Sequence, residues 1–270
     1  MPVEKKYYEE PKCLLNMHPE VTPIPVRRIL DKLDSLLEKK DSDGAERLRR
    51  NWISEADAGN DMQGKLTVYN EQIGLYRKLG RENECLSAID AALSLASQIG
   101  AEDSVTGGTT FVNAATGYKA FGRASDALPL YRRAQDVYER LLKDGDDRLA
   151  GLYNNMALTL CELGEYAEAE DKYEKAIVIL KKAEHREAEI AITYLNLADL
   201  TVAREGFEEG AERIEWYLRL AEALLDEESI PRDGYYAFVC EKCAPVFGYY
   251  GYFLAEKKFT ERAREIYERA

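Results

Sequence analysis

The stretch LYNNMALTLCELGEYAEAEDKYEKAI, from Leu152 to Ile177, decides the fold of this chain. Its first half places apolar side chains at positions 153, 156, 157 and 160, which is the i, i+3, i+4, i+7 spacing of one helix face. Gly164 then interrupts the pattern, and small and aromatic residues at 169, 173 and 176 resume it. Because the small residues let two backbones approach while the large ones fill the gaps between turns, the stretch predicts two helices packed against each other.

The same pattern recurs along the chain with a nearly constant period. Gly80, Gly122, Gly164 and Gly206 are each 42 residues apart, and the flanking apolar positions recur around the first three. The fourth copy is looser, and weaker copies lie near both ends. The sequence therefore predicts six helical hairpins, starting near residues 26, 66, 108, 150, 191 and 244. Since such hairpins cannot bury their apolar faces alone, neighbours stack, and residues 26–270 are expected to form an all-α solenoid.

Two segments lie outside the repeat. Residues 1–25 hold five of the eight prolines and show little periodicity, so they are expected to form an extended N-terminal arm. One hypothesis places this arm along the chain's own groove as an internal ligand, and the alternative is a capping role. The stretch LDEESIPRDG, from Leu225 to Gly234, predicts a loop before the last hairpin, because Pro231 and Gly234 interrupt helices.

The composition excludes several classes of function. The 50 acidic side chains outnumber the 37 basic ones and give a net charge of −13, which argues against binding to nucleic acid. No stretch reaches the ~18 uncharged residues of a membrane helix, and the opening MPVEKKYYEE lacks the apolar run of a secretion signal. A cytoplasmic protein with reduced, packed cysteines is therefore expected. With His18 and His185 as the only histidines, neither a metal site nor a cofactor is predicted.

The order of residues within each hairpin resembles the signature of the tetratricopeptide repeat (TPR) family, which is an aromatic, a Leu-Gly/Ala pair, an aromatic, then Ala, aromatic and Ala across two helices. The resemblance covers residues 26–270. The period of 41–42 residues exceeds the family's usual length of about 34 and is similar to the long repeats of kinesin light chains and of bacterial peptide-responsive regulators. The resemblance implies a right-handed superhelix whose first helices line a concave groove. It also implies a non-enzymatic scaffold that binds a protein or an extended peptide in that groove.

Asparagines recur in register on the predicted first helices, at positions that line the groove in the resembled family and there bind the backbone of an extended peptide. The side chain suits this role because it offers both a carbonyl acceptor and an amide donor. Basic side chains one turn further on are expected to attract a carboxylate of the ligand. The alternative is that the asparagines cap turns or bond to the neighbouring hairpin. The predicted groove residues are Asn70, Arg77, Asn113, Lys119, Asn154, Asn155 and Asn196.

The stretch from Tyr235 to Phe253 holds eight of the chain's aromatic residues, which number 7 Phe, 18 Tyr and 2 Trp. Tyrosine combines an apolar face with a polar tip, so it suits half-wet cores and interfaces alike. Core packing of the last hairpin is one interpretation, and a partner patch is the other. Because no polar capping helix follows Ala270, a homodimer contact through this hairpin is also expected. The predicted patch residues are Tyr235, Tyr236, Tyr249 and Tyr252.

Two other functions compete with the scaffold. The first is a peptide-responsive regulatory protein, in which a bound peptide changes the pitch of the solenoid and thereby a partner contact. The second is an enzyme that uses the aromatic C-terminal stretch as a pocket, with Cys240 or Cys243 as nucleophile. A zinc site at the same cysteines would need two more ligands, and only Cys13 and His18 are available, so none is predicted.

Overall fold

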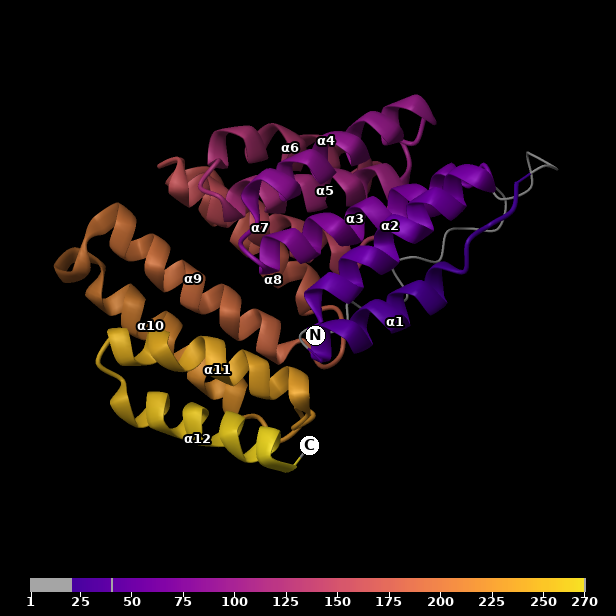
Figure 1. Ribbon diagram of the computed structural model, residues 1–270. Helices are drawn as coiled ribbons and strands as arrows, with labels where there is room; N and C mark the ends of the chain where they lie inside the picture. The colour runs from indigo at the N-terminus through magenta and orange to yellow at the C-terminus, as the bar shows by residue number, and fades with distance from the viewer. Residues whose placement is uncertain (1–20, 40, 270) are drawn as a thin grey trace. The chain divides into compact units, whose positions relative to one another are not determined.

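The computed structural model describes residues 21–39 and 41–269, which form twelve α-helices and no strands (Figure 1). The chain divides into two compact units, one ending at Leu141 and one starting at Leu142. The helices of the first unit are α1 (Val26–Glu38), α2 (Ser42–Ala58), α3 (Met62–Lys78), α4 (Glu82–Gln98), α5 (Val105–Ala120) and α6 (Ala124–Leu141). The helices of the second unit are α7 (Asp147–Glu162), α8 (Tyr166–Leu180), α9 (Glu187–Glu205), α10 (Phe207–Asp226), α11 (Gly234–Tyr249) and α12 (Phe253–Arg269).

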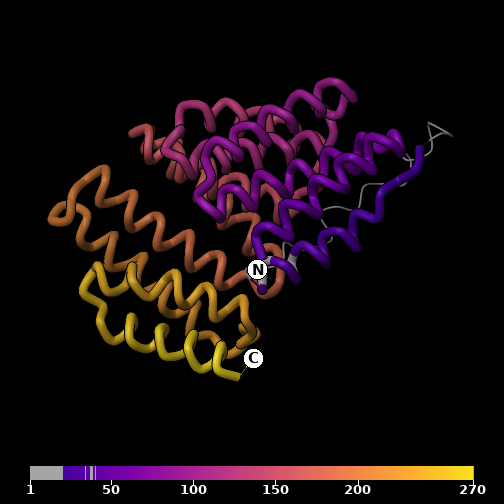
Figure 2. Tube along the Cα trace, viewed as in Figure 1, coloured from indigo at the N-terminus to yellow at the C-terminus, as the bar shows by residue number. Residues whose placement is uncertain are grey.

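Successive helices pair into hairpins, and within each unit neighbouring hairpins contact one another (Figure 2). The predicted all-α solenoid of stacked hairpins is thereby confirmed. The first five hairpins begin at residues 26, 62, 105, 147 and 187, each within four residues of the predicted start. The last begins at Gly234 and not near 244, because Asp233 caps α11: its Oδ1 accepts hydrogen bonds from the amides of Tyr235 and Tyr236, both at 3.0 Å. The loop before it is shorter than predicted, since α10 continues to Asp226.

The recurring glycines occupy the turns between the two helices of a hairpin. The backbone φ is +66° at Gly80, +73° at Gly122, +78° at Gly164 and +86° at Gly206. Glycine adopts this left-handed region without the steric penalty that a Cβ brings. The 42-residue spacing seen in the sequence therefore marks a backbone conformation that each hairpin needs.

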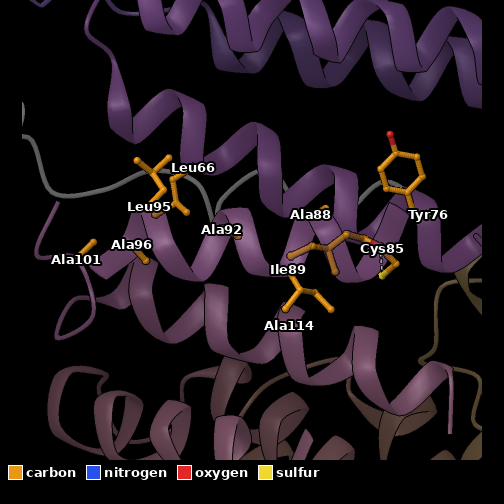
Figure 3. Packing of buried hydrophobic residues seen from close by; sticks show 11 residues of the cluster. Leu66, Tyr76, Cys85, Ala88, Ile89, Ala92, Leu95, Ala96, Ala101 and Ala114 are labelled. Atoms are coloured by element: carbon orange, nitrogen blue, oxygen red, sulfur yellow. Dashed lines mark hydrogen bonds between the residues drawn. The ribbon is translucent and has the colours of Figure 1, made fainter. Parts of the chain in front are cut away.

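Small residues let the helices of the first unit approach closely (Figure 3). An added Cβ at Gly117 of α5 would lie 2.8 Å from Cδ1 of Ile89, so α5 packs against α4 at this distance only because the position is glycine. Each large apolar side chain buried here contributes about 1.5–3 kcal/mol to the stability of the fold. The buried cluster consists of Leu66, Ile73, Tyr76, Cys85, Ala88, Ile89, Ala92, Leu95, Ala96, Ala101 and Ala114.

Of the predicted N-terminal arm, the structure describes residues 21–25. The amide of Thr22 donates to the carbonyl of Gly59 at 2.8 Å, and the amide of Ile24 donates to Oδ2 of Asp61 at 2.8 Å. The other oxygen of Asp61 accepts the amide of Gly64 at 2.9 Å and caps α3. This end of the arm is therefore fixed against the turn between α2 and α3. The hypothesis that the arm occupies the groove concerns residues 1–20, which lie outside the described residues.

In the second unit, aromatic packing and ion pairs hold the last helix, α12, against its neighbours. The buried rings of Phe247 in α11 and Phe259 in α12 lie 5.3 Å apart. Lys258 Nζ contacts Asp226 Oδ2 at 2.6 Å, and Arg262 Nη1 contacts Asp226 Oδ1 at 2.7 Å, so α12 is held to α10 as well as to α11. Across the residues described, the structure contains no helix with both the length and the apolar character that crossing a bilayer requires.

Candidate functional site

Two of the predicted groove asparagines join neighbouring hairpins. Asn70 Nδ2 donates to Thr110 Oγ1 at 3.0 Å, which links α3 to α5. In the second unit, Thr193 Oγ1 donates to Asn154 Oδ1 at 3.1 Å and links α7 to α9. Asn70 is only 4% exposed, so it belongs to the packing between hairpins and does not line an open groove as predicted. For these two positions the structure supports the interpretation that asparagine bonds to the neighbouring hairpin.

The other three asparagines have a different environment. Asn113 on α5, Asn155 on α7 and Asn196 on α9 are each half-buried at the surface of a first helix. Asn155 and Asn196 lie in the same unit, on helices that contact one another, whereas Asn113 belongs to the first unit. Among the described residues, no partner within hydrogen-bond distance is found for the side-chain amides of Asn155 and Asn196. Neither amide is therefore used in the packing between the described helices.

The two predicted basic groove residues lie at helix ends. Arg77 is exposed in the last turn of α3, and Lys119 is half-buried in the last turn of α5. Cations in the last turn are favoured there by the partial negative charge of the helix C-terminus. Their position is thus explained by helix stability, and attraction of a ligand carboxylate stays a prediction.

The predicted tyrosine patch contains one residue of the core. Tyr236 is 1% exposed, because its hydroxyl donates to the carbonyl of Leu225 at 2.8 Å and accepts from Arg262 Nη1 at 3.1 Å. The guanidinium of Arg232 covers its ring at 4.2 Å. The prediction that Tyr236 contacts a partner at the surface is therefore wrong. Its polar tip is used inside the last two hairpins.

The other three tyrosines of the patch differ in exposure. Tyr235 is half-buried, and burial together with the neighbouring Glu189 carboxyl raises its pKa. Tyr252 is half-buried, with its ring 6.5 Å from that of Phe247. Tyr249 is 66% exposed and is the member of the predicted patch that a partner reaches most readily.

The two C-terminal cysteines lie in the core of α11. Cys240 and Cys243 are both buried, and burial raises the pKa of both thiols, that of Cys243 to about 12. A nucleophilic cysteine needs access and a stabilised thiolate, and neither thiol has these. Within the described residues, no group of three or more His, Cys, Asp or Glu side chains is placed to hold a metal ion. Cys13 and His18 lie outside the described residues.

A pocket of about 480 Å³ lies between α9 and α11, and sequence reasoning missed it. Asp199 lies at its wall and accepts a hydrogen bond at 2.7 Å from the hydroxyl of Tyr250, 51 residues away. The local signal was a single charged residue, Asp199, in the stretch Leu197–Val202, one turn after Asn196. The pocket is lined by Asp199, Val202, Ala203, Pro245, Val246, Tyr249 and Tyr250.

Comparisons with known proteins agree on the repeat. Two models of the tetratricopeptide repeat family match residues 65–140 and residues 149–184. No curated protein matches the sequence.

Solved structures show the same fold. The crystal structure of BtubC (BKLC) from P. vanneervenii is similar with a TM-score of 0.67 and 23% identity, over 76% of this chain and 83% of that chain. A protein of Podosopora anserina with nearly identical TPR-like repeats of the kinesin light chain kind is similar with a TM-score of 0.54 and 15% identity, over 76% and 96%. A substituted form of that protein gives a TM-score of 0.56 at 15% identity, over 76% and 97%. At these identities the likeness concerns the fold.

The matched segments cover the hairpins in which the glycine spacing and the alternation of small and aromatic residues are most regular. The structure places those residues in the turns and cores of stacked helical hairpins. Residues 65–140 and 149–184 therefore carry tetratricopeptide repeats, and such repeats suggest a protein-interaction scaffold.

Proposed function

We propose that the chain is a non-enzymatic scaffold that binds an extended peptide, or an extended segment of a protein partner, along the first helices of its hairpins. The observation that carries this proposal is the pair Asn155 and Asn196 on the contacting helices α7 and α9. Both are half-buried, and the neighbouring Asn154 already supplies the bond between the two hairpins. The side-chain amides of Asn155 and Asn196 are therefore not needed to join the two helices.

The spacing suits an extended ligand. Packed helices lie about 8–10 Å apart, and an extended chain advances about 3.3 Å per residue. Successive first helices would thus contact the ligand about every third residue. Each asparagine can accept from one backbone N–H and donate to one backbone carbonyl of such a ligand.

The described residues favour the scaffold over its alternatives. The thiol enzyme lacks support, because both candidate nucleophiles are buried and protonated. The regulator needs an effector region, whereas every helix among the described residues belongs to a repeat hairpin.

The test is a pull-down from native cell extract with the wild-type chain and with Asn155→Ala/Asn196→Ala, followed by mass spectrometry. The matched control is Asn51→Ala/Asn83→Ala, which removes two exposed asparagines from the second helices α2 and α4. A partner that the control retains and the first-helix variant loses supports the proposal. With that partner identified, each lost amide should weaken binding by about 1–3 kcal/mol. If both variants retain every partner, the proposal is wrong.

Two further expectations are tested beside it. The same role in the first unit is tested with Asn113→Ala, Arg77→Ala and Lys119→Ala. If Arg77 and Lys119 attract a carboxylate of the ligand, replacing either one should weaken the binding of acidic partners in particular. A homodimer through the C-terminal hairpin requires that the sedimentation coefficient rise with protein concentration.

A further inference from the structure

The turns of the last two hairpins lie at the same end of α9 and α11 (Figure 1). An aromatic cluster joins these two turns. The ring of Phe207, the first residue of α10, lies 5.8 Å from that of Tyr249 and 5.9 Å from that of Tyr250. The two tyrosine rings lie 5.1 Å apart. Phe207 is 49% exposed and Tyr249 is 66% exposed. The cluster is therefore accessible at the surface beside the pocket between α9 and α11.

The pocket also holds a carboxylate that lacks a counter-charge. Asp199 receives the hydroxyl of Tyr250, and among the described residues no basic side chain pairs with it. Several other acids of the second unit are paired, as in the contacts of Glu170 with Arg204 and of Asp226 with Lys258. Asp199 is exposed at the wall of the pocket, where partial desolvation raises the pKa of its carboxyl and the hydrogen bond from Tyr250 lowers it. A cation placed in the pocket would supply the missing partner.

We propose that the pocket between α9 and α11 binds the cationic side chain, lysine or arginine, of a basic segment in the partner protein. Ammonium and guanidinium groups are attracted to the faces of aromatic rings within about 6 Å, and they form charge-assisted hydrogen bonds with carboxylates. The pocket offers both features, with the rings of Tyr249 and Tyr250 beside Asp199. Its volume of about 480 Å³ accommodates one long side chain.

The charge of the whole chain points to the same partner. A net charge of −13 attracts basic segments and speeds their encounter with the surface. The pocket also lies one helical turn beyond Asn196 on α9, so a peptide bound by that asparagine would carry a side chain past the pocket. This inference rests on the proposed function to the extent that the cation belongs to a peptide partner.

The experiment uses the full chain labelled with [15N]glycine. Gly206, Gly248 and Gly251 flank the pocket and report on its occupation, whereas Gly164 lies in the turn of another hairpin. The probes are N-acetyl-lysine N′-methylamide and its neutral analogue N-acetyl-norleucine N′-methylamide, titrated separately. The lysine probe should shift the three flanking signals and leave Gly164 unchanged. The norleucine probe should need at least a tenfold higher concentration for the same shift.

Variants of Asp199 and Tyr249 then test whether the carboxylate and the ring bind the lysine probe. Asp199→Asn keeps the acceptor for Tyr250 but removes the charge, and it should raise the half-saturating concentration of the lysine probe at least tenfold. Tyr249→Leu should weaken binding by several-fold. The matched controls Asp90→Asn and Tyr267→Ala change exposed residues away from the pocket and should have no effect. The glycine spectrum of each variant shows whether it is folded.

Either of two results would overturn the inference. Equal binding of both probes would make the pocket a plain apolar site, and an unchanged midpoint in Asp199→Asn would remove the carboxylate from recognition. The variant Asn155→Ala/Asn196→Ala separates this inference from the scaffold function. This variant should leave the half-saturating concentration of the lysine probe unchanged, because the probe has no extended backbone. Each of the two proposals can therefore fail while the other stands.

Discussion

Replacing Thr110 by valine is expected to cost about 1–3 kcal/mol of unfolding free energy, although the two side chains have almost the same shape. Thr110 is fully buried, and its hydroxyl accepts the hydrogen bond from Asn70 Nδ2 at 3.0 Å. Asn70 Oδ1 already has no hydrogen-bond partner within the described residues. Valine would therefore leave the whole amide of a 4% exposed side chain without partners.

The equivalent bond in the second unit provides the comparison. Thr193→Val removes the donor to Asn154 Oδ1, but Asn154 is half-buried, so water can replace the lost hydroxyl. The expected cost is only about 0.5–1 kcal/mol. The double variant Asn70→Ala/Thr110→Val removes both partners, so no buried amide is left unpaired. It should therefore be more stable than Thr110→Val alone, which a double-mutant cycle would show as coupling between the two residues.

Urea unfolding followed by tryptophan fluorescence measures these differences. Trp52 lies in α2 of the first unit and Trp216 in α10 of the second, so each unit has its own reporter. With an m value of about 2 kcal/mol/M, a loss of 2 kcal/mol lowers the midpoint by about 1 M. The reasoning is refuted if Thr110→Val costs no more than Thr193→Val, or if the double variant is no more stable than Thr110→Val.

Two further predictions concern the last hairpins. Cys240 and Cys243 are expected to react with a thiol reagent at pH 8 only as fast as the second unit unfolds. The reason is that both thiols are buried and burial keeps them protonated. Rapid labelling of the native chain would contradict this prediction. Acidification is expected to weaken the contact of α12 with α10. Burial acts to raise the pKa of Asp226, but hydrogen bonds from Lys258 and Arg262 outweigh it and hold the pKa below the ordinary 3.8. The stabilisation is therefore present above that pH and is lost as the pH falls through the lowered pKa. Asp226→Asn should reduce the difference in unfolding free energy between pH 7 and pH 3, measured by urea titration. If this difference is unchanged in the variant, the Asp226 carboxyl is not the group responsible for the loss of stability in acid.

Local signals explain why most of the fold could be predicted. Each turn glycine sits at positive φ, and each hairpin carries small residues where two helices meet, so both features leave a periodic mark in the sequence. The prediction was wrong where a local signal was overlooked. Asp233 caps α11 ten residues before the expected start, and the repeat pattern around Phe247 carries no mark of that cap.

The candidate site depends on contacts that no local pattern encodes. Asn154 and Asn155 are adjacent, chemically identical and both half-buried, yet Asn154 bonds to the next hairpin, whereas no partner for the Asn155 amide is found among the described residues. Tyr236 and Tyr249 belong to one aromatic stretch, yet α10 and α12 cover the first and leave the second exposed.

The sequence by itself determined that this chain forms helices, where most of them turn, and that they repeat as hairpins, because these properties follow from neighbours in the chain. Only the tertiary structure decided which polar side chains join hairpins and which do not. Asp199 and Tyr250 are 51 residues apart, and the pocket they share exists only because α9 and α11 pack together. The physical reason is that helical periodicity fixes the face on which a side chain lies, whereas its burial and its partners depend on the helix that packs against that face.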